Sequence, residues 1–460
     1  MLLPFSSFQR KGNKGQRLLN VYAEPASPDS AQPVMLIGCP GIRATTSYSE
    51  LECRGVFRHQ GYPHAVMGTH LVKQTGTTVT KLGTIPGSDR VQMASNGKQL
   101  CVLANGDAYI LEGSTLTEAS GDYQKASAVT EIDGRFVFTA RGSNKHFCSE
   151  FYDGLDYDGA RFDLADKYSD NAVGITASEV MIIIGCEETT EFWYNAGLSP
   201  YPYQRTPGGL TNIGLRAKHS YATDESGTYF LASDNTVRYI PLGSTEAIKV
   251  SIPGVEEKIA KYEKRENAWS FISNEDGNNM YHLVFPEAGA CWVFSITSKL
   301  WHERGSLNKD YWNVGGHCSI NGEDIIYDRD SGNIGQLDPD HYSEWDYELL
   351  RSWTYSNVSG KGKYVQHHEL QVEIDTGWNP SLGQEAQLML EISDDGGETF
   401  RGPRTVTAWN RGEYGRRANY HKMGRARNRV YRASITDDVK LVVRDTQLRA
   451  TGAVLPQRAA

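Results

Sequence analysis

The sequence predicts an all-β protein, a six- or seven-bladed β-propeller followed by a C-terminal β-sandwich. Short apolar runs recur along the chain, and clusters of Gly, Asn, Asp and Ser bound each of them. Helical periodicity is nearly absent, with one plausible helical stretch at residues 255–266. Comparable groups of strands begin about every 43 residues between residues 53 and 310, close to the roughly 40–50 residues of a four-stranded blade.

Residues 1–49 are predicted to be an extended segment that precedes the repeats. Prolines stand at positions 25, 28, 33 and 40, and the positive charges follow a short apolar start. That order of charge and hydrophobicity is wrong for a secretory signal. Two interpretations stay open for this segment, an arm or a strand that closes the propeller ring.

Residues 50–345 are assigned to the propeller. Apolar runs such as residues 99–103 and 108–111 are separated by tight turns, here Asn105-Gly106-Asp107. Turns of this kind need a positive φ and are typical of β-hairpins. A stacked β-sandwich is the alternative, but two packed sheets would not require so regular a repeat over about 300 residues.

Residues 346–460 are predicted to form the C-terminal β-sandwich. A linker-like segment rich in Gly, Ser and Lys at residues 356–363 precedes a change to longer strands, at residues 369–374, 386–392, 430–435 and 439–443. We expect six to eight strands in two packed sheets.

Composition narrows the function classes. The 460 residues carry a net charge of −9, so the whole molecule is not an electrostatic nucleic-acid binder, and DNA would meet a local patch or a repelling wall. The longest apolar run, residues 180–184, is the size of a strand. Seven scattered cysteines without a C-x-x-C pair indicate reduced thiols in a core rather than disulfides or zinc. We expect no metal and no cofactor.

One turn matches a known pattern. Ser393, Asp395, Gly397 and Phe400 fit the Asp-box S-x-D-x-G-x-T-W, with Phe in place of Trp. The carboxylate can accept backbone N–H bonds while the glycine takes a positive φ, so the motif is predicted to be a structural hairpin turn. The same motif recurs in sialidases and other propellers, but a sialidase would need several copies and an arginine triad.

An acidic segment covers residues 150–170, with seven Asp or Glu. Asp156 and Asp158, followed by Gly159, resemble the middle of a calcium loop, but Gly154 and Ala165 stand where two ligands belong. A solvated or subunit-facing loop is therefore favoured over a divalent-ion site, which stays open.

A basic stripe covers residues 401–432, with ten Lys or Arg and a single acid, Glu413. The residues expected to face a subunit interface or DNA are Arg416, Arg417, Lys422, Arg425, Arg427 and Arg429. Contact with an acidic neighbouring subunit is the preferred interpretation. Phosphate contact and a plain solvated surface are the alternatives.

Catalytic motifs are missing from the sequence. It contains no G-x-S-x-G, H-E-x-x-H, G-K-[ST] or strand-following G-x-G-x-x-G. His367 and His368 are adjacent on a predicted strand, where neighbouring side chains point to opposite faces. The chain is therefore predicted not to be an enzyme.

Several segments together resemble the packaged-DNA stabilisation protein family, the tail hub or tail accessory factor of short-tailed bacteriophages. They follow the order of that family along most of the chain: QRLLNVYAE at 16–24, GCPG at 38–41, DNAVG at 170–174, TTEFWYNAG at 189–197, PYQR at 202–205, CWVF at 291–294, WHER at 301–304, LEISDDGG at 390–397 and MGRAR at 423–427.

The resemblance implies a virion structural protein assembled in the host cytoplasm. It implies a ring of six copies in the virion tail, below the portal and adaptor, that extends the DNA channel and retains packaged DNA. The implied partners are portal and adaptor proteins, a tail needle or nozzle, tailspikes or fibres, and double-stranded DNA that passes without sequence-specific binding; no membrane insertion is implied. Two alternatives remain, a glycan-binding or glycan-cleaving propeller and a structural tail component of a long-tailed phage.

Overall fold

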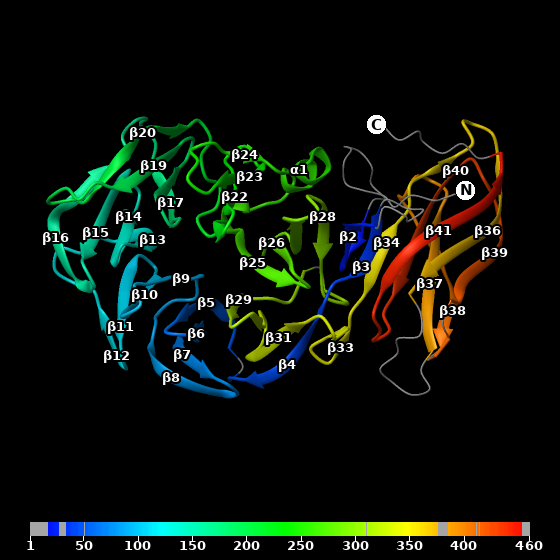
Figure 1. Ribbon diagram of the computed structural model, residues 1–460, viewed down its shortest axis with the longest axis horizontal. Coiled ribbons are helices and arrows are strands. Elements are labelled where there is room, and N and C mark those ends of the chain that lie inside the picture. Colours follow the sequence, from blue (N-terminus) through cyan, green and yellow to red (C-terminus); the bar gives the residue numbers. More distant parts are fainter. Residues whose placement is uncertain are drawn as a thin grey trace.

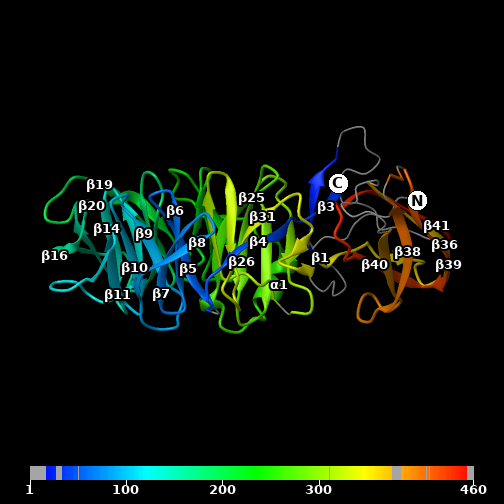
Figure 2. The ribbon, with the colours of Figure 1, turned by 90° about the horizontal axis from the view of Figure 1, so that it is seen from below.

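The computed structural model describes residues 17–26, 34–49, 51–309, 311–375, 385–410, 412–413 and 415–452. A ring of sheets occupies one side of the molecule and a second body of long strands the other (Figure 1). Seen from below, the ring is a disc and the second body continues its plane (Figure 2). The molecule is therefore elongated, with the outer edge of the ring at one end and the second body at the other.

The ring is a propeller of seven four-stranded blades within the described residues. Consecutive strands pair antiparallel through short connections in blades 1 to 6. Blade 1 is β5 (Cys53–His59), β6 (Tyr62–Met67), β7 (His70–Thr75) and β8 (Thr78–Thr84); blade 2 is β9 (Gln92–Ser95), β10 (Gln99–Ala104), β11 (Asp107–Glu112) and β12 (Thr115–Glu118); blade 3 is β13 (Ala126–Ile132), β14 (Arg135–Ala140), β15 (Lys145–Glu150) and β16 (Asp153–Leu164). Blade 4 is β17 (Ala172–Ala177), β18 (Ile182–Cys186), β19 (Thr190–Asn195) and β20 (Tyr203–Thr211); blade 5 is β21 (Ala222–Asp224), β22 (Gly227–Leu231), β23 (Val237–Pro241) and β24 (Ile248–Lys249); blade 6 is β25 (Trp269–Glu275), β26 (Asn278–Phe285), β27 (Ala290–Ser295) and β28 (Trp301–Arg304).

Blade 7 takes its outer strand from the N-terminal segment. It consists of β29 (Gly316–Ile320), β30 (Glu323–Tyr327), β31 (Asn333–Asp338) and, antiparallel to β31, β4 (Gly41–Ser47). On its other side β4 pairs with β32 (Ser343–Glu344), which in turn pairs with β33 (Tyr347–Glu348). At Gly41 the backbone of β4 lies so close to Ser343 of β32 that a Cβ there would be 2.1 Å from the Ser343 carbonyl oxygen.

The second body is a β-sandwich. One sheet has the order β2 (Val21–Pro25), β3 (Val34–Gly38), β41 (Val442–Thr451), β36 (Val365–Ile374) and β39 (Arg417–Ala426). The other has the order β1 (Leu18–Leu19), β34 (Arg351–Thr354), β40 (Asn428–Ile435), β37 (Glu385–Ser393) and β38 (Arg401–Asn410), and β35 (Val358–Ser359) also pairs with β40. Alternate side chains of these strands are buried, as two facing sheets require.

The two bodies share one sheet and one core. Strand β1 pairs parallel with β28 of blade 6 and antiparallel with β34 of the sandwich. The same apolar cluster includes Trp292 and Trp301 of blade 6 together with Trp353, Trp409 and Tyr431 of the sandwich. The predicted fold class is thus confirmed. The expected helix is shorter than the pattern suggested, since α1 spans Pro253–Ile259 and only a 3₁₀ turn at Arg265–Asn267 follows.

Candidate functional site

The Asp-box residues form a closed turn between β37 and β38 of the sandwich. The Asp395 carboxylate accepts hydrogen bonds from the hydroxyl of Ser393 (2.6 Å) and from the backbone N–H groups of Glu398 and Thr399 (both 3.0 Å). These bonds from Ser393 and Thr399 hold the pKa of Asp395 far below its usual range. Gly397 has a φ of 99°, and Phe400 lies under the guanidinium of Arg432 at 3.9 Å. The carboxylate is therefore engaged by its own turn, and the turn lies outside the propeller, so the motif gives no support to a glycan-processing site.

The basic stripe divides into paired and unpaired residues. Arg416 contacts Glu413 at 2.6 Å, and Arg417 contacts Glu373 at 2.9 Å. Arg429 is buried against Asp394 at 2.6 Å. Within the part of the chain that the structure describes, Lys422, Arg425 and Arg427 have no carboxylate within 4.0 Å.

The unpaired arginines surround an exposed tyrosine. The guanidinium groups of Arg425 and Arg427 lie 5.2 and 4.9 Å from the ring centre of Tyr364, which is 57% exposed. Lys361 and Lys363 are exposed in the turn before that ring, and the backbone N–H of Gly360 in this turn bonds to the Arg427 carbonyl at 2.9 Å. We call Lys361, Lys363, Tyr364, Arg425 and Arg427 the tyrosine-centred basic patch. Sequence reasoning missed its first three members, although the alternation of Gly and Lys at residues 360–363 was the available signal.

The acidic segment forms the outer edge of blade 3. Glu150 is neutralised by Arg135 and Arg161, both at 2.7 Å. Asp153, Asp158 and Asp163 accept only local backbone N–H bonds among the described residues, at 2.8–3.0 Å. No group of three His, Cys, Asp or Glu suited to a metal ion occurs in the described part of the chain.

The same edge exposes large apolar side chains. Phe151 is 55% exposed, and Tyr152, Leu155, Phe162, Leu164 and Tyr168 are exposed near it. Strand β16 is the outermost strand of its blade and carries unpaired backbone groups. An exposed edge strand with a concentrated apolar surface is typical of a protein–protein contact. Together with Asp153, Asp156, Asp158 and Asp163 we call this surface the blade 3 edge.

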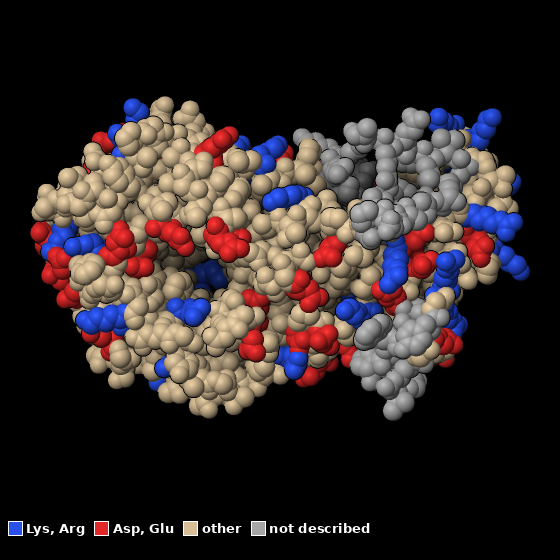
Figure 3. Space-filling model, in the orientation of Figure 1, with Lys and Arg blue, Asp and Glu red and all other residues tan. Residues whose placement is uncertain are grey.

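The two surfaces lie at opposite ends of the molecule. Strand β16 is at one end of the long axis, and β36 and β39 are at the other (Figure 1). In Figure 3 acidic side chains line the first end with basic ones among them, and basic side chains project from the second end with acidic ones between them.

A cavity opens near the axis of the propeller. Its volume is about 400 Å³, and it is lined by residues in or just before the first strands of blades 1, 2, 5, 6 and 7, by residues at the end of β26 and in the turn after it, and by the β30–β31 turn. Four basic and four acidic residues line it: Arg54, Arg90, Lys218, Arg329, Glu52, Asp89, Glu266 and Glu287. Figure 3 agrees with this composition, since it shows a hollow near the centre of the propeller with basic side chains inside and acidic side chains along the rim.

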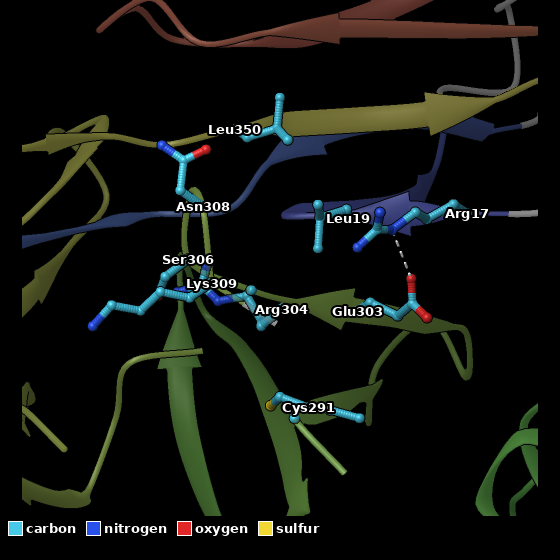
Figure 4. A pocket seen from close by; sticks show the side chains of 12 residues that line it. Arg17, Leu19, Cys291, Glu303, Arg304, Ser306, Asn308, Lys309 and Leu350 are labelled. Carbon is cyan, nitrogen blue, oxygen red and sulfur yellow. Dashed lines mark hydrogen bonds and ion pairs between the residues drawn. The ribbon is translucent and has the colours of Figure 1, made fainter. Parts of the chain in front are cut away.

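A second cavity, of about 260 Å³, lies where the propeller joins the sandwich. Arg17 points toward Glu303 across it, with Nε and Oε2 3.2 Å apart (Figure 4). Lys258 also contacts Glu303, at 2.8 Å. The Glu303 carboxylate is therefore paired with both Arg17 and Lys258, and its ion pair with Arg17 holds the start of β1 against blade 6.

The remaining reactive groups are buried. All seven cysteines are buried and unpaired, and burial raises the pKa of Cys53 to about 11 and that of Cys39 to about 12. His367 is buried and shares a 2.7 Å hydrogen bond with the hydroxyl of Tyr431, whereas His368 is exposed on the other face of β36. Among the described residues no helix is long and apolar enough to cross a membrane.

Two family models match in succession. The model described as "Bacteriophage P22 Gp10, beta-propeller" matches residues 15–342, and the one described as "Bacteriophage P22 Gp10, beta-sandwich" matches residues 353–451. The chain belongs to the bacteriophage P22 Gp10 family. It is thus a phage structural protein of the Gp10 type, and the family recognised from the ordered sequence segments is confirmed.

Other comparisons add little to the Gp10 assignment. No curated protein matches. The solved structures that resemble the chain include the computationally designed Ika8 protein (10% identity, 64% of this chain and 99% of that chain, TM-score 0.41). They also include BamB from Moraxella catarrhalis (9% identity, 73% and 97%, TM-score 0.40) and the Cps50 (Swd1) β-propeller domain of Myceliophteria thermophila (9% identity, 64% and 98%, TM-score 0.44). These similarities are too low to bear on function.

Proposed function

We propose that the protein is the repeating subunit of a ring in the tail of a short-tailed bacteriophage. The ring would lie below the portal and adaptor, extend the DNA channel and retain packaged DNA until ejection. The observation that carries the proposal is the match of both domains to the Gp10 family in the order of the chain. Portal and adaptor proteins, a needle or nozzle and tailspikes or fibres are the expected neighbours.

The charge distribution supports a ring closed by head-to-tail contacts. A heterologous contact joins two different surfaces of the same subunit and closes when the rotation between copies allows it. The tyrosine-centred basic patch and the blade 3 edge are different surfaces, of opposite charge, at opposite ends of the molecule. We propose that the basic patch of one copy contacts the blade 3 edge of the next, so that the stripe serves the subunit interface rather than DNA.

The overall charge supports a channel wall for DNA. A net charge of −9 disfavours tight phosphate binding over most of the surface. A duplex could then move past the ring without sequence-specific contacts.

Assembly of the purified protein tests the ring proposal. Size exclusion with light scattering would be run on the chain alone and on the chain mixed with portal–adaptor complexes. We expect the chain to join the complex as a closed ring, with or without ring formation on its own. A chain that stays monomeric and never joins portal–adaptor complexes would contradict the proposal.

Charge reversal tests the interface. Arg425→Glu with Arg427→Glu should block ring formation while leaving the monomer folded, because neither side chain has a carboxylate partner among the described residues. Combining it with Asp156→Lys and Asp158→Lys should restore assembly. Arg416→Glu with Arg417→Glu is the matched comparison, and it should weaken assembly less, since these arginines already pair with Glu413 and Glu373. Normal assembly of the Arg425 and Arg427 variant would refute this interface.

A further inference from the structure

We propose that the axial cavity of the propeller is a binding site for a phosphate-type oxyanion, held between Arg90 and Lys218. The proposal concerns the single chain and does not depend on the ring.

Arg90 reaches the cavity from the segment before blade 2. Its guanidinium stacks on the Trp269 ring at 3.7 Å, and Nη1 donates to the Gly315 carbonyl at 2.8 Å. This is its one hydrogen bond among the described residues, and no described carboxylate lies within 4.0 Å of it. The ring and the carbonyl thus fix the plane of the guanidinium while its remaining N–H groups are left for a ligand.

Lys218 reaches the cavity from the segment before blade 5. Its ammonium group makes a long 3.4 Å contact with the Ser127 carbonyl and has no carboxylate within 4.0 Å among the described residues. His219 lines the same cavity and pairs with Trp269, the residue under Arg90, as an isolated parallel bridge. Arg90 and Lys218 therefore converge on one space from two different blades.

Burial disfavours the charged forms of the basic groups in the cavity. Burial lowers the pKa of Arg90 to about 10. Burial, followed by the charges of Lys218 and Arg90, lowers the pKa of His219 well below its usual value. Burial also lowers the pKa of Lys218. The charge of Asp89 raises this pKa in part, and the charge of Arg141 lowers it further. An anion between Arg90 and Lys218 would offset the cost of desolvating each of these two charges.

The other charged groups of the cavity define the ligand. The Arg54 guanidinium already donates to the carbonyls of Gly68, Ile85, Pro86 and Asp89, and Arg329 donates to the Pro286 carbonyl and lies over Tyr311. The acidic residues Glu52, Asp89, Glu266 and Glu287 are exposed, so they form a rim that a large polyanion would meet first. A compact dianion that fits between Arg90 and Lys218 suits this arrangement, because a planar guanidinium matches phosphate geometry.

Thermal unfolding of the full chain tests the site. Sodium phosphate and sodium pyrophosphate would be compared with sodium chloride at matched ionic strength and pH, and binding would be measured in parallel by calorimetry. We expect phosphate to raise Tm, because a ligand that binds only the folded state stabilises it. A larger response to pyrophosphate would identify a ligand that carries more than one phosphate group.

Two variants and a control locate the site. Lys218→Met keeps most of the side-chain stem, and Arg90→Gln removes the guanidinium; each should weaken phosphate binding by about tenfold or more, the usual effect of a lost charged hydrogen bond. Lys81→Met, an exposed lysine on β8, should leave binding unchanged. If Arg90→Gln does not fold, Lys218→Met alone decides the result. Equal Tm values in phosphate and chloride for the unaltered chain, or a phosphate response that survives in Lys218→Met, would overturn the proposal.

Discussion

Asn20 joins the propeller to the sandwich, and its replacement should destabilise both. Its side-chain Nδ2 donates to the carbonyls of Gly305 (2.7 Å) and Leu350 (2.8 Å), and its Oδ1 accepts from the Gly305 N–H (3.1 Å). The residue is fully buried and has a φ of 53°. Gly305 follows the last strand of blade 6, and Leu350 precedes β34 of the sandwich.

The hydrogen bonds and the backbone conformation of Asn20 set the expected loss in the free energy of unfolding for two variants. Three lost hydrogen bonds at about 1 kcal/mol each give a loss of about 3 kcal/mol in the free energy of unfolding for Asn20→Gly. Asn20→Ala adds about 1 kcal/mol, because a Cβ disfavours the left-handed backbone that asparagine tolerates and glycine adopts freely.

Urea unfolding followed by tryptophan fluorescence measures this loss. The nine tryptophans include Trp301 and Trp353 on either side of the seam. Two outcomes would refute the reasoning. One is a loss below about 1 kcal/mol for Asn20→Ala, which would mean that water replaces the three bonds. The other is an Asn20→Gly variant no more stable than Asn20→Ala, which would remove the backbone argument.

Three further predictions concern the core. Burial alone would raise the pKa of Glu275, but Arg304 and His282 outweigh burial and lower this pKa from 4.5 to about 2. The ionised carboxylate therefore stabilises the fold above about pH 4.5, and this stabilisation is lost as the pH falls toward 2. Glu275→Gln should flatten that part of the stability–pH profile, and an unchanged slope would contradict the assignment. Gly41→Ala should cost about 1–3 kcal/mol in thermal or urea unfolding, because its Cβ meets the Ser343 carbonyl, whereas unchanged stability would mean that β4 shifts freely. The seven buried cysteines should resist a thiol reagent in the folded chain and all react in denaturant, and rapid labelling of the native protein would refute their burial.

Blades 1 to 6 were predictable because their pairing is local. Each strand pairs with the next through a short connection, and many of these are tight turns whose residues, such as Asn105 and Gly106, take the positive φ values that Asn and Gly favour. The long-range partners of β1 and β4 carried no such signal. Strand β4 pairs with β31 and β1 pairs with β28 and β34, all far along the chain, and no turn chemistry connects them.

The charged surfaces were predictable only in part. Counting residues located the basic stripe, but a count cannot tell that Arg429 is neutralised by Asp394, nor that Arg427 has no carboxylate partner among the described residues. Pairing depends on which strands become neighbours. The axial cavity could not be predicted from the sequence, because Arg90 and Lys218 belong to no motif and only closure of the ring brings them to one space.

The N-terminal segment makes the two domains one mechanical unit. Its β4 completes blade 7, its β2–β3 hairpin extends a sheet of the sandwich, and β1 continues the other sheet into blade 6. Neither domain therefore keeps its full set of strands if this segment is pulled away. In the proposed ring the sandwich of one copy holds the propeller of the next, so a load between copies would be carried by sheet hydrogen bonds and a shared core. A flexible linker between the domains would let the proposed ring deform, whereas this arrangement would keep its channel rigid.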